Sequence, residues 1–124
     1  EKKELKLKVI QDIKSSGRPL QLRRCFVNII ENAIRYSQKI LVELNVDNDN
    51  ILIDVSDDGP GVPQEKFEDI FKPFFTLDPS RNKLKGESGL GMTIARDIVR
   101  SHGGEIVLSK SLMGGLKVTI RLPK

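Results

Sequence analysis

The fold is decided by residues 40–61, which read ILVELNVDNDNILIDVSDDGPG. Apolar and polar side chains alternate on both sides of the polar cluster DNDN at 47–50. This period of two is typical of strands that bury one face, and a polar turn between two such runs predicts a β-hairpin. The sequence DDGPG at 57–61 then ends the second strand, because glycine and proline in that pattern favour a turn.

Further elements are predicted on both sides of this hairpin. Leucine and valine alternate with lysine over residues 5–9 and predict a strand. Apolar residues at spacings of three and four from Leu22 onward predict an amphipathic helix that ends near Tyr36. Downstream, the pattern predicts a short helix at 64–70, a long loop at 72–88, a helix at 89–101 and a second hairpin at 105–109 and 116–122. The predicted fold class is α+β, a two-layer sandwich with a mixed, mostly antiparallel sheet and helices on one face.

Length and composition exclude several classes of protein. With 124 residues, of which 38% are apolar, the chain is expected to form a single domain over residues 1–124. One cysteine, Cys25, and one histidine, His102, exclude an intrachain disulfide and a Cys/His zinc site. Apolar runs fall far short of the about 20 residues that span a bilayer, so this segment is expected to be soluble. A net charge of +4 is too mild to indicate nucleic-acid binding, and the aromatic residues do not alternate with basic ones.

The first motif with candidate chemistry lies on the long helix. Asn28 and Asn32 are four residues apart and therefore share a face. A carboxamide oxygen is a suitable ligand for Mg²⁺, which takes few protein ligands and completes its shell with phosphate oxygens and water. Arg35 and Tyr36 follow, as candidates for holding a phosphate and covering a ring. Two solvated asparagines, an exposed arginine and a packed tyrosine are the alternative interpretation.

The second and third motifs are rich in glycine. In DDGPG at 57–61, glycines let a ligand approach the backbone, and a carboxylate at a strand end can accept a hydrogen bond from an exocyclic amine; an ordinary turn is the alternative. In GESGLGM at 86–92, glycines lead into a helix whose free N–H groups favour an anion. The pattern is neither Gly-x-Gly-x-x-Gly nor a P-loop, so a nucleotide phosphate is expected on a different fold from either.

In this order, the three motifs resemble the ATP-binding domain of sensor histidine kinases, which shares a superfamily with the ATPases of DNA gyrase, heat-shock chaperones and mismatch repair. The resemblance covers about residues 18–123. Besides the asparagine helix and the turn at 57–61, it includes FKPF at 71–74, SGLG at 88–91 and GG at 114–115 before the last strand. Residues 71–105 look most like those of osmosensor-type kinases.

The resemblance implies a role for each residue around the adenine of ATP. Asp57 is expected to accept a hydrogen bond from the adenine amino group. Gly59, Gly61 and Val62 are expected to shape the pocket, and Tyr36 to flank the ring.

The resemblance likewise implies how the phosphates are held. Asn32, helped by Asn28, is expected to hold Mg²⁺ on the triphosphate, with Arg35 beside a phosphate. The loop at 72–88 is expected to act as a lid over ATP, although a basic loop facing water is the alternative. The further phosphate-binding candidates lie in this loop and at the following helix start: Arg81, Lys85, Ser88, Gly89, Leu90 and Gly91.

Two departures from the family pattern bear on activity. Glu87 stands where the family usually has glycine, and it is expected to narrow the approach to the phosphates or to place a carboxylate near them. At position 28 the hydrolysing members carry a glutamate that activates water, whereas this chain has Asn28, and an amide is not a general base. Glu31 is adjacent to Asn32 and about 100° round the helix, so it is a poor substitute. The chain is therefore better suited to phosphoryl transfer than to hydrolysis.

The resemblance also implies partners. The acceptor is expected to be a histidine, and His102 lacks the acidic residue that follows the phosphoacceptor, so a structural role is predicted for it. The acceptor is then expected on a dimerisation domain N-terminal to Glu1 in a longer parent protein, with a response regulator acting indirectly and the fragment itself monomeric. The fragment is expected to be cytoplasmic and its parent to lie in the cell membrane. Alternatives are an ATPase of the same superfamily and a regulatory domain that has lost nucleotide binding.

Overall fold

The computed structural model describes residues 4–9, 19–73, 75 and 91–123. Most of the predicted loop at 72–88 and the first two residues of the predicted helix at 89–101 lie outside these ranges. The expected lid therefore stays a prediction.

Five strands form one sheet in the order β1-β2-β3-β5-β4. They are β1 (Glu4–Val9), β2 (Lys39–Val46), β3 (Asn50–Asp57), β4 (Glu105–Lys110) and β5 (Leu116–Pro123). β1 is parallel to β2, whereas the other neighbouring strands are antiparallel. The predicted strands and both predicted hairpins are confirmed, and the sheet is mixed and mostly antiparallel.

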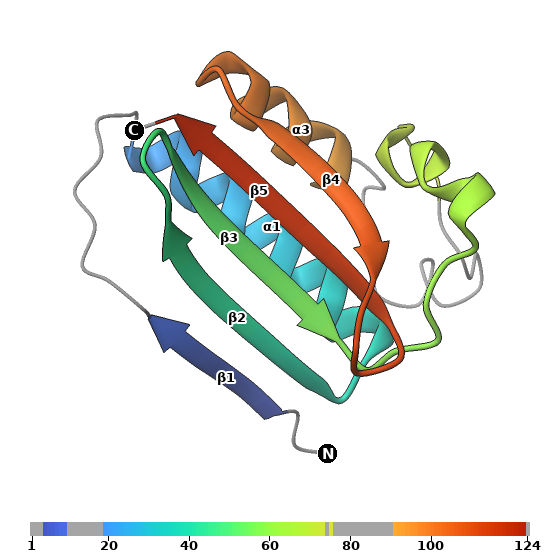
Figure 1. Ribbon diagram of the computed structural model, residues 1–124. Coiled ribbons are helices and arrows are strands. Elements are labelled where there is room, and N and C mark those ends of the chain that lie inside the picture. The colour runs from blue at the N-terminus through green and yellow to red at the C-terminus, as the bar shows by residue number, and fades with distance from the viewer. Residues whose placement is uncertain (1–3, 10–18, 74, 76–90, 124) are drawn as a thin grey trace.

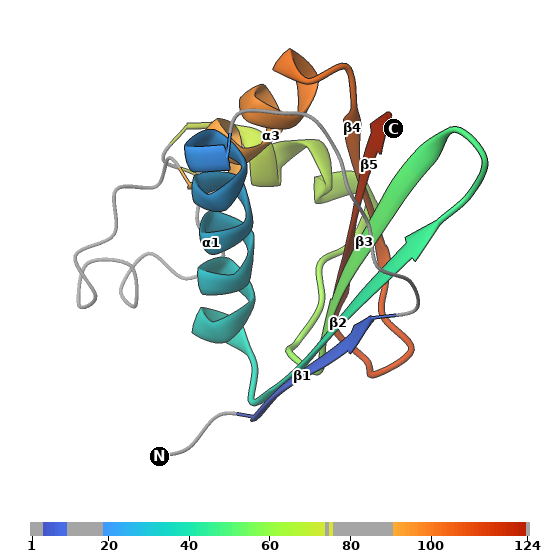
Figure 2. The same ribbon diagram turned by 90° about the vertical axis from the view of Figure 1, so that its left-hand side faces the viewer.

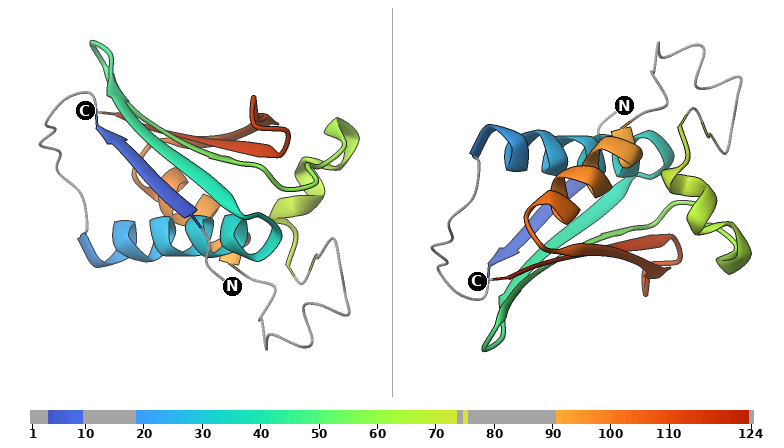
Figure 3. Two further views of the ribbon diagram at one scale, coloured as in Figure 1. Left: turned by 90° about the horizontal axis from the view of Figure 1, so that it is seen from below. Right: turned by 90° about the horizontal axis from the view of Figure 1, so that it is seen from above.

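Two helices, α1 (Pro19–Tyr36) and α3 (Gly91–Ser101), cover one face of this sheet (Figure 1). Figure 2 shows the two layers edge-on, with the helices on one side and the strands on the other. Views from below and above show that α1 and α3 cross each other rather than lie parallel (Figure 3). The α+β sandwich is therefore confirmed.

The prediction of one short helix at 64–70 is wrong. Two 3₁₀ turns occupy this stretch, η1 (Gln64–Lys66) and η2 (Glu68–Phe71). Their amides bond three residues back, as in the bond of 3.1 Å from Phe67 N to the Gln64 carbonyl. Segments this short gain little from α-helical bonding, and i→i+3 bonds let the chain change direction before Ile70 and Phe71 enter the core.

The core lies between the helices and the inner face of the sheet. The register places Val42, Val55 and Val118 side by side on β2, β3 and β5, so the alternating apolar residues form continuous inward rows. α1 meets α3 where the fully buried Cys25 thiol donates to the Ala95 carbonyl at 3.6 Å, and burial raises the pKa of this thiol to about 11. Within the described ranges, neither helix is long and apolar enough to cross a membrane.

Candidate functional site

The inward row of β3 ends in a carboxylate. Ile51, Ile53 and Val55 face the helices, and the same alternation brings Asp57 to that face at the end of the strand. Asp57 is only 6% exposed. Burial raises its pKa, and the amides of Leu116 and Gly59 oppose this by bonding to the charged form. A carboxylate on an apolar face is costly, so its position calls for an account beyond folding.

Backbone amides from two segments hold Asp57 in place. Its Oδ1 accepts hydrogen bonds from Gly59 N at 2.9 Å and from Leu116 N at 3.0 Å, and its carbonyl accepts one from Gly115 N at 3.1 Å. A side chain on Gly115 would collide with the Asp57 carboxylate, its carbonyl and the amide of Gly59. The turn between β4 and β5 therefore closes directly on the end of β3, and only glycine fits at position 115.

The next two residues attach the end of α1 to the same place. Asp58 Oδ1 accepts hydrogen bonds of 2.9 Å from the amides of both Gln38 and Lys39, and these bonds lower the pKa of Asp58. A side chain on Gly59 would begin 2.6 Å from the Tyr36 carbonyl, so the two segments touch through their backbones. Figure 1 shows the end of α1, the end of β3 and the β4–β5 turn converging at one end of the molecule.

The predicted asparagines lie on the flank of α1 that faces α3. Asn28 and Asn32 are both half-buried. A side chain on Gly91, the first residue of α3, would begin 3.8 Å from Asn28 Cβ, which places the start of α3 against Asn28. Arg35 Nη1 donates to Asn32 Oδ1 at 3.4 Å, and the Arg35 guanidinium lies 5.9 Å from the centre of the Tyr36 ring. The helix therefore carries two amides and a cation on the flank toward α3, while Tyr36 at its end meets the turn after Asp57.

The other predicted residues divide into two groups. Gly61 has φ +76° and would bring a side chain to 3.3 Å from the Gly114 carbonyl, so glycine is required there; Val62 packs on the core. The remaining predicted residues lie outside the described ranges: Arg81, Lys85, Glu87, Ser88, Gly89 and Leu90.

Sequence reasoning missed the residues that tie α3 to the 3₁₀ turns. Thr93 Oγ1 donates to the Phe71 carbonyl at 2.7 Å. Arg96 lies 4.4 Å from the centre of the Phe71 ring and bonds both carboxylate oxygens of Glu68 at 3.2 and 3.3 Å. It also missed the roles of Asp58 and Gly115. No local pattern points to these contacts, because the partners are far apart in the chain.

His102 has the structural position that the sequence predicts. It follows α3, and its Nδ1 lies 2.9 Å from the Ile98 carbonyl at the end of that helix. An imidazole there satisfies a terminal carbonyl of the helix.

The donor set around Asn28 and Asn32 fits Mg²⁺ bound through a nucleotide. Among the described residues there is no group of three or more His, Cys, Asp or Glu side chains that could hold a metal ion. Mg²⁺ needs only one or two protein oxygens when phosphates and water supply the rest, and two half-buried amides on one helical face could provide them. A cage built from protein ligands alone is therefore not required.

A family model described as "Histidine kinase-, DNA gyrase B-, and HSP90-like ATPase" matches residues 17–124. The chain belongs to this family. Sensor histidine kinase GtrS of Pseudomonas aeruginosa is 42% identical over 109 residues, which are 87% of this chain and 22% of that protein. Sensor histidine kinase CpxA of Escherichia coli is 44% identical over 108 residues, which are 86% of this chain and 24% of that protein.

Solved structures of histidine kinase domains have the same fold. The mycobacterial sensor histidine kinase MprB superposes with a TM-score of 0.82 at 26% identity, covering 97% of this chain and 80% of that one. A nucleotide-free catalytic domain of histidine kinase ThkA superposes with a TM-score of 0.85 at 25% identity, covering 98% of this chain and 78% of that one. This ATPase domain spans less than a quarter of the length of the curated relatives GtrS and CpxA.

Proposed function

We propose that this chain is the catalytic domain of a two-component sensor histidine kinase, which binds Mg-ATP and transfers the γ-phosphoryl group to a histidine elsewhere in its parent protein. The observation that carries the proposal is the buried Asp57 carboxylate at the junction of α1, β3 and the β4–β5 turn. The family assignment and the likeness to sensor kinases support it independently.

Recognition of adenine rests on Asp57. The described hydrogen bonds to its carboxylate use Oδ1, and a carboxylate can accept more than two bonds. The second oxygen then accepts from the adenine amino group. Gly59, Gly61 and Val62 form the adjoining wall, and Tyr36 lies at the end of α1 beside it.

Positioning of the phosphates rests on the flank of α1 that faces α3. Asn28 and Asn32 would hold Mg²⁺ by their amide oxygens, and Mg²⁺ when bound would neutralise charge that develops on the triphosphate. Arg35 donates to the Asn32 oxygen and adds a positive charge beside it. Arg81 and Lys85, in the expected lid, and the amides that follow Ser88 are proposed to add phosphate contacts.

Phosphoryl transfer is favoured over hydrolysis of ATP because position 28 carries no general base that could activate water. Asn28 stands on the helical turn before Asn32, and an amide does not take a proton from water at neutral pH. Glu31 is exposed, on a different flank of α1 from the two asparagines. The nucleophile is therefore a histidine brought in by another domain, whose phosphate passes to a response regulator. Because ATP is supplied by the cytosol, we place this domain there and its parent at the membrane.

Two measurements test the proposal. Calorimetric titration of ATP with Mg²⁺ into the isolated chain should give saturable binding that Asn32→Ala abolishes or weakens at least tenfold, whereas the exposed-site control Asn45→Ala should bind normally. Addition of a dimerisation domain with its histidine should then move ³²P from γ-labelled ATP to that domain. Absence of nucleotide binding would overturn the proposal in favour of a regulatory domain, and rapid phosphate release without an acceptor would favour an ATPase.

A further inference from the structure

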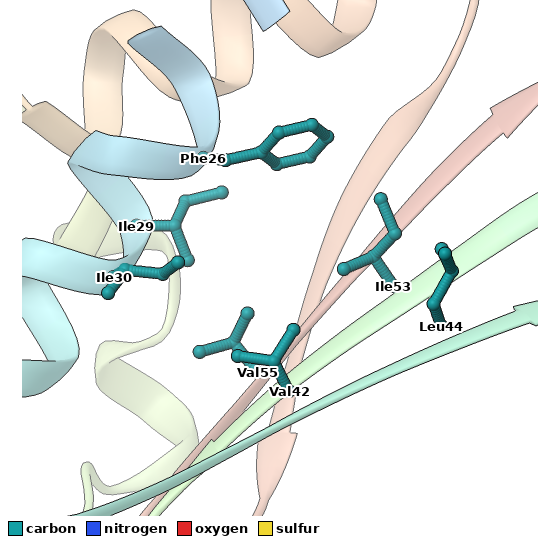
Figure 4. Close-up of a pocket in the computed structure, with 7 residues that line it drawn as sticks. All are labelled: Phe26, Ile29, Ile30, Val42, Leu44, Ile53 and Val55. Carbon is teal, nitrogen blue, oxygen red and sulfur yellow. The ribbon is translucent and has the colours of Figure 1, made fainter. Parts of the chain in front are cut away.

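A second surface lies on the other side of α1 from the asparagines. An apolar groove of about 240 Å³ opens between α1 and the strands β2 and β3, and Figure 4 shows its side chains pointing toward one another across it. The lining residues are all apolar: Phe26, Ile29, Ile30, Val42, Leu44, Ile53 and Val55. Ile30 lies two residues after Asn28 and is therefore about 200° round the helix from it. The groove is thus on the opposite flank of α1 from the asparagines, and it comes nearest to the candidate nucleotide site at Val55, two residues before Asp57 on the same face of β3.

The groove continues onto the outer surface of α1 as an exposed apolar stripe. Leu20, Val27 and Ile34 are 83%, 41% and 37% exposed, and each lies seven residues after the one before it. Arg23 and the groove residue Ile30 lie between them at the intervening positions of the heptad. We call these five residues the α1 seam. A heptad of this kind is the pattern that a second α-helix packs against.

The charges on and beside the seam indicate which side chains that helix carries. Arg23, itself part of the seam, and Arg24 are exposed near the start of α1, whereas Glu31 is exposed about two turns further on. A complementary helix carries acidic residues opposite the arginines and a basic residue opposite Glu31. Its apolar side presents one large side chain to the groove, because a cavity of about 150 Å³ already accommodates benzene.

The size of the seam favours a tethered partner over a free one. α1 has 18 residues, so its outer face is about 27 Å long and 10 Å wide, or roughly 270 Å². Stable complexes between separate proteins bury about 800 Å² on each partner. A helix linked in the same protein needs much less, because its effective concentration is high. The curated relatives are about four times longer than the matched region, which leaves room for such a helix.

We propose that the α1 seam and its groove dock an amphipathic helix from another part of the parent protein. The inference rests on the proposed function only in placing this domain within a longer kinase. Docking on this side leaves the asparagine side of α1 free for nucleotide.

Cysteine labelling tests the docking directly. Val27→Cys should react with a maleimide at least tenfold more slowly in the full-length parent than in the isolated chain, because the docked helix covers the seam. Val107→Cys, at another exposed valine, on β4, is the matched control and should react at the same rate in both. The native Cys25 does not interfere, since it is fully buried and its pKa is raised.

The remaining outcomes distinguish the alternatives. Adding Arg24→Glu to the parent should restore fast labelling of Val27→Cys, because it opposes acidic residues on the partner helix. Equal labelling in parent and isolated chain, or no effect of Arg24→Glu, would overturn the proposal. Slow labelling of Val27→Cys already in the isolated chain would also overturn the proposal. Slow labelling that depends on protein concentration would indicate a second copy of the chain, and slow labelling that does not would indicate residues 10–18. Nucleotide titration of the isolated chain reports on the proposed function separately.

Discussion

The substitution Asp57→Asn tests whether the Asp57 carboxylate serves ligand binding or stabilises the fold. Asp57 is 6% exposed, and burial raises its pKa. Asparagine keeps the shape and an oxygen that accepts from Gly59 and Leu116, but it carries no charge. We therefore expect the free energy of unfolding at pH 7 to stay equal or to rise.

The pH dependence of this difference follows from the direction of the shift. The pKa of Asp57 is higher in the folded chain than its ordinary value of 3.8, so ionisation of the carboxylate opposes folding at neutral pH. That cost disappears as the pH falls through the raised pKa and then 3.8. Urea unfolding of both proteins from roughly pH 7 down to pH 4 should show the advantage of the variant shrinking.

Nucleotide affinity should change in the opposite direction. Loss of a hydrogen bond to a charged acceptor costs about 1.5–3 kcal/mol, so the Kd for ATP should rise about 10- to 150-fold. GTP carries an oxygen in place of the adenine amino group and should gain relative to ATP, because the introduced amide donates a hydrogen bond where the Asp57 carboxylate only accepts one. Calorimetric titration with both nucleotides measures this. Unchanged ATP affinity, or a marked loss of stability at pH 7, would refute the assignment of Asp57 to adenine.

Three further substitutions test the construction of the site. Gly115→Ala should lower stability by about 1–3 kcal/mol in urea unfolding and also weaken ATP binding, because a methyl group there collides with Asp57; a neutral effect would contradict the packing. Asp58→Ala should lower the urea midpoint at pH 7, and since the pKa of Asp58 is lowered in the fold, the difference from the native protein should vanish as pH falls below 3.8; a difference that persists there would exclude a charge effect. Thr93→Val should cost about 1 kcal/mol by removing the donor to the Phe71 carbonyl, whereas Thr93→Ser should restore it.

The elements could be predicted from the sequence because each depends on a local period. Alternation over 40–46 and 51–55 gives strands, and the polar cluster between them gives the hairpin. Pairing between strands that are distant in the chain could not be predicted in this way. β1 pairs in parallel with β2, although all of α1 lies between them in the sequence. No single strand carries a signal that selects its partner strand or its direction. The two 3₁₀ turns were missed because the pattern of a short helix does not specify its hydrogen bonding.

The surroundings of the candidate site could be predicted only in part, for the same reason. Asp57 and Asn32 are candidates that their local motifs predict, but the partners of Asp57 include Gly115 and Leu116, far along the chain. A backbone amide such as that of Leu116 carries no sequence signature, because every residue except proline has one. The glycine at 115 is a visible signal, yet only the structure shows that it is there to admit the Asp57 carboxylate.

One helix connects the candidate nucleotide site to the docking surface. α1 buries Cys25 and Ala33 against α3 and the sheet, presents Asn32 on one flank and exposes Val27 on the other. Because an α-helix of 18 residues moves as one body, a partner that turns or shifts α1 from the Val27 side also moves Asn32 relative to Asp57, which is held by the sheet and by the β4–β5 turn. Docking at the seam would then change the geometry between Asn32 and Asp57, the residues proposed to bind metal and adenine, without touching the nucleotide. Linkage requires the reverse as well, so bound Mg-ATP should change the protection of Val27→Cys in the parent by the same free energy.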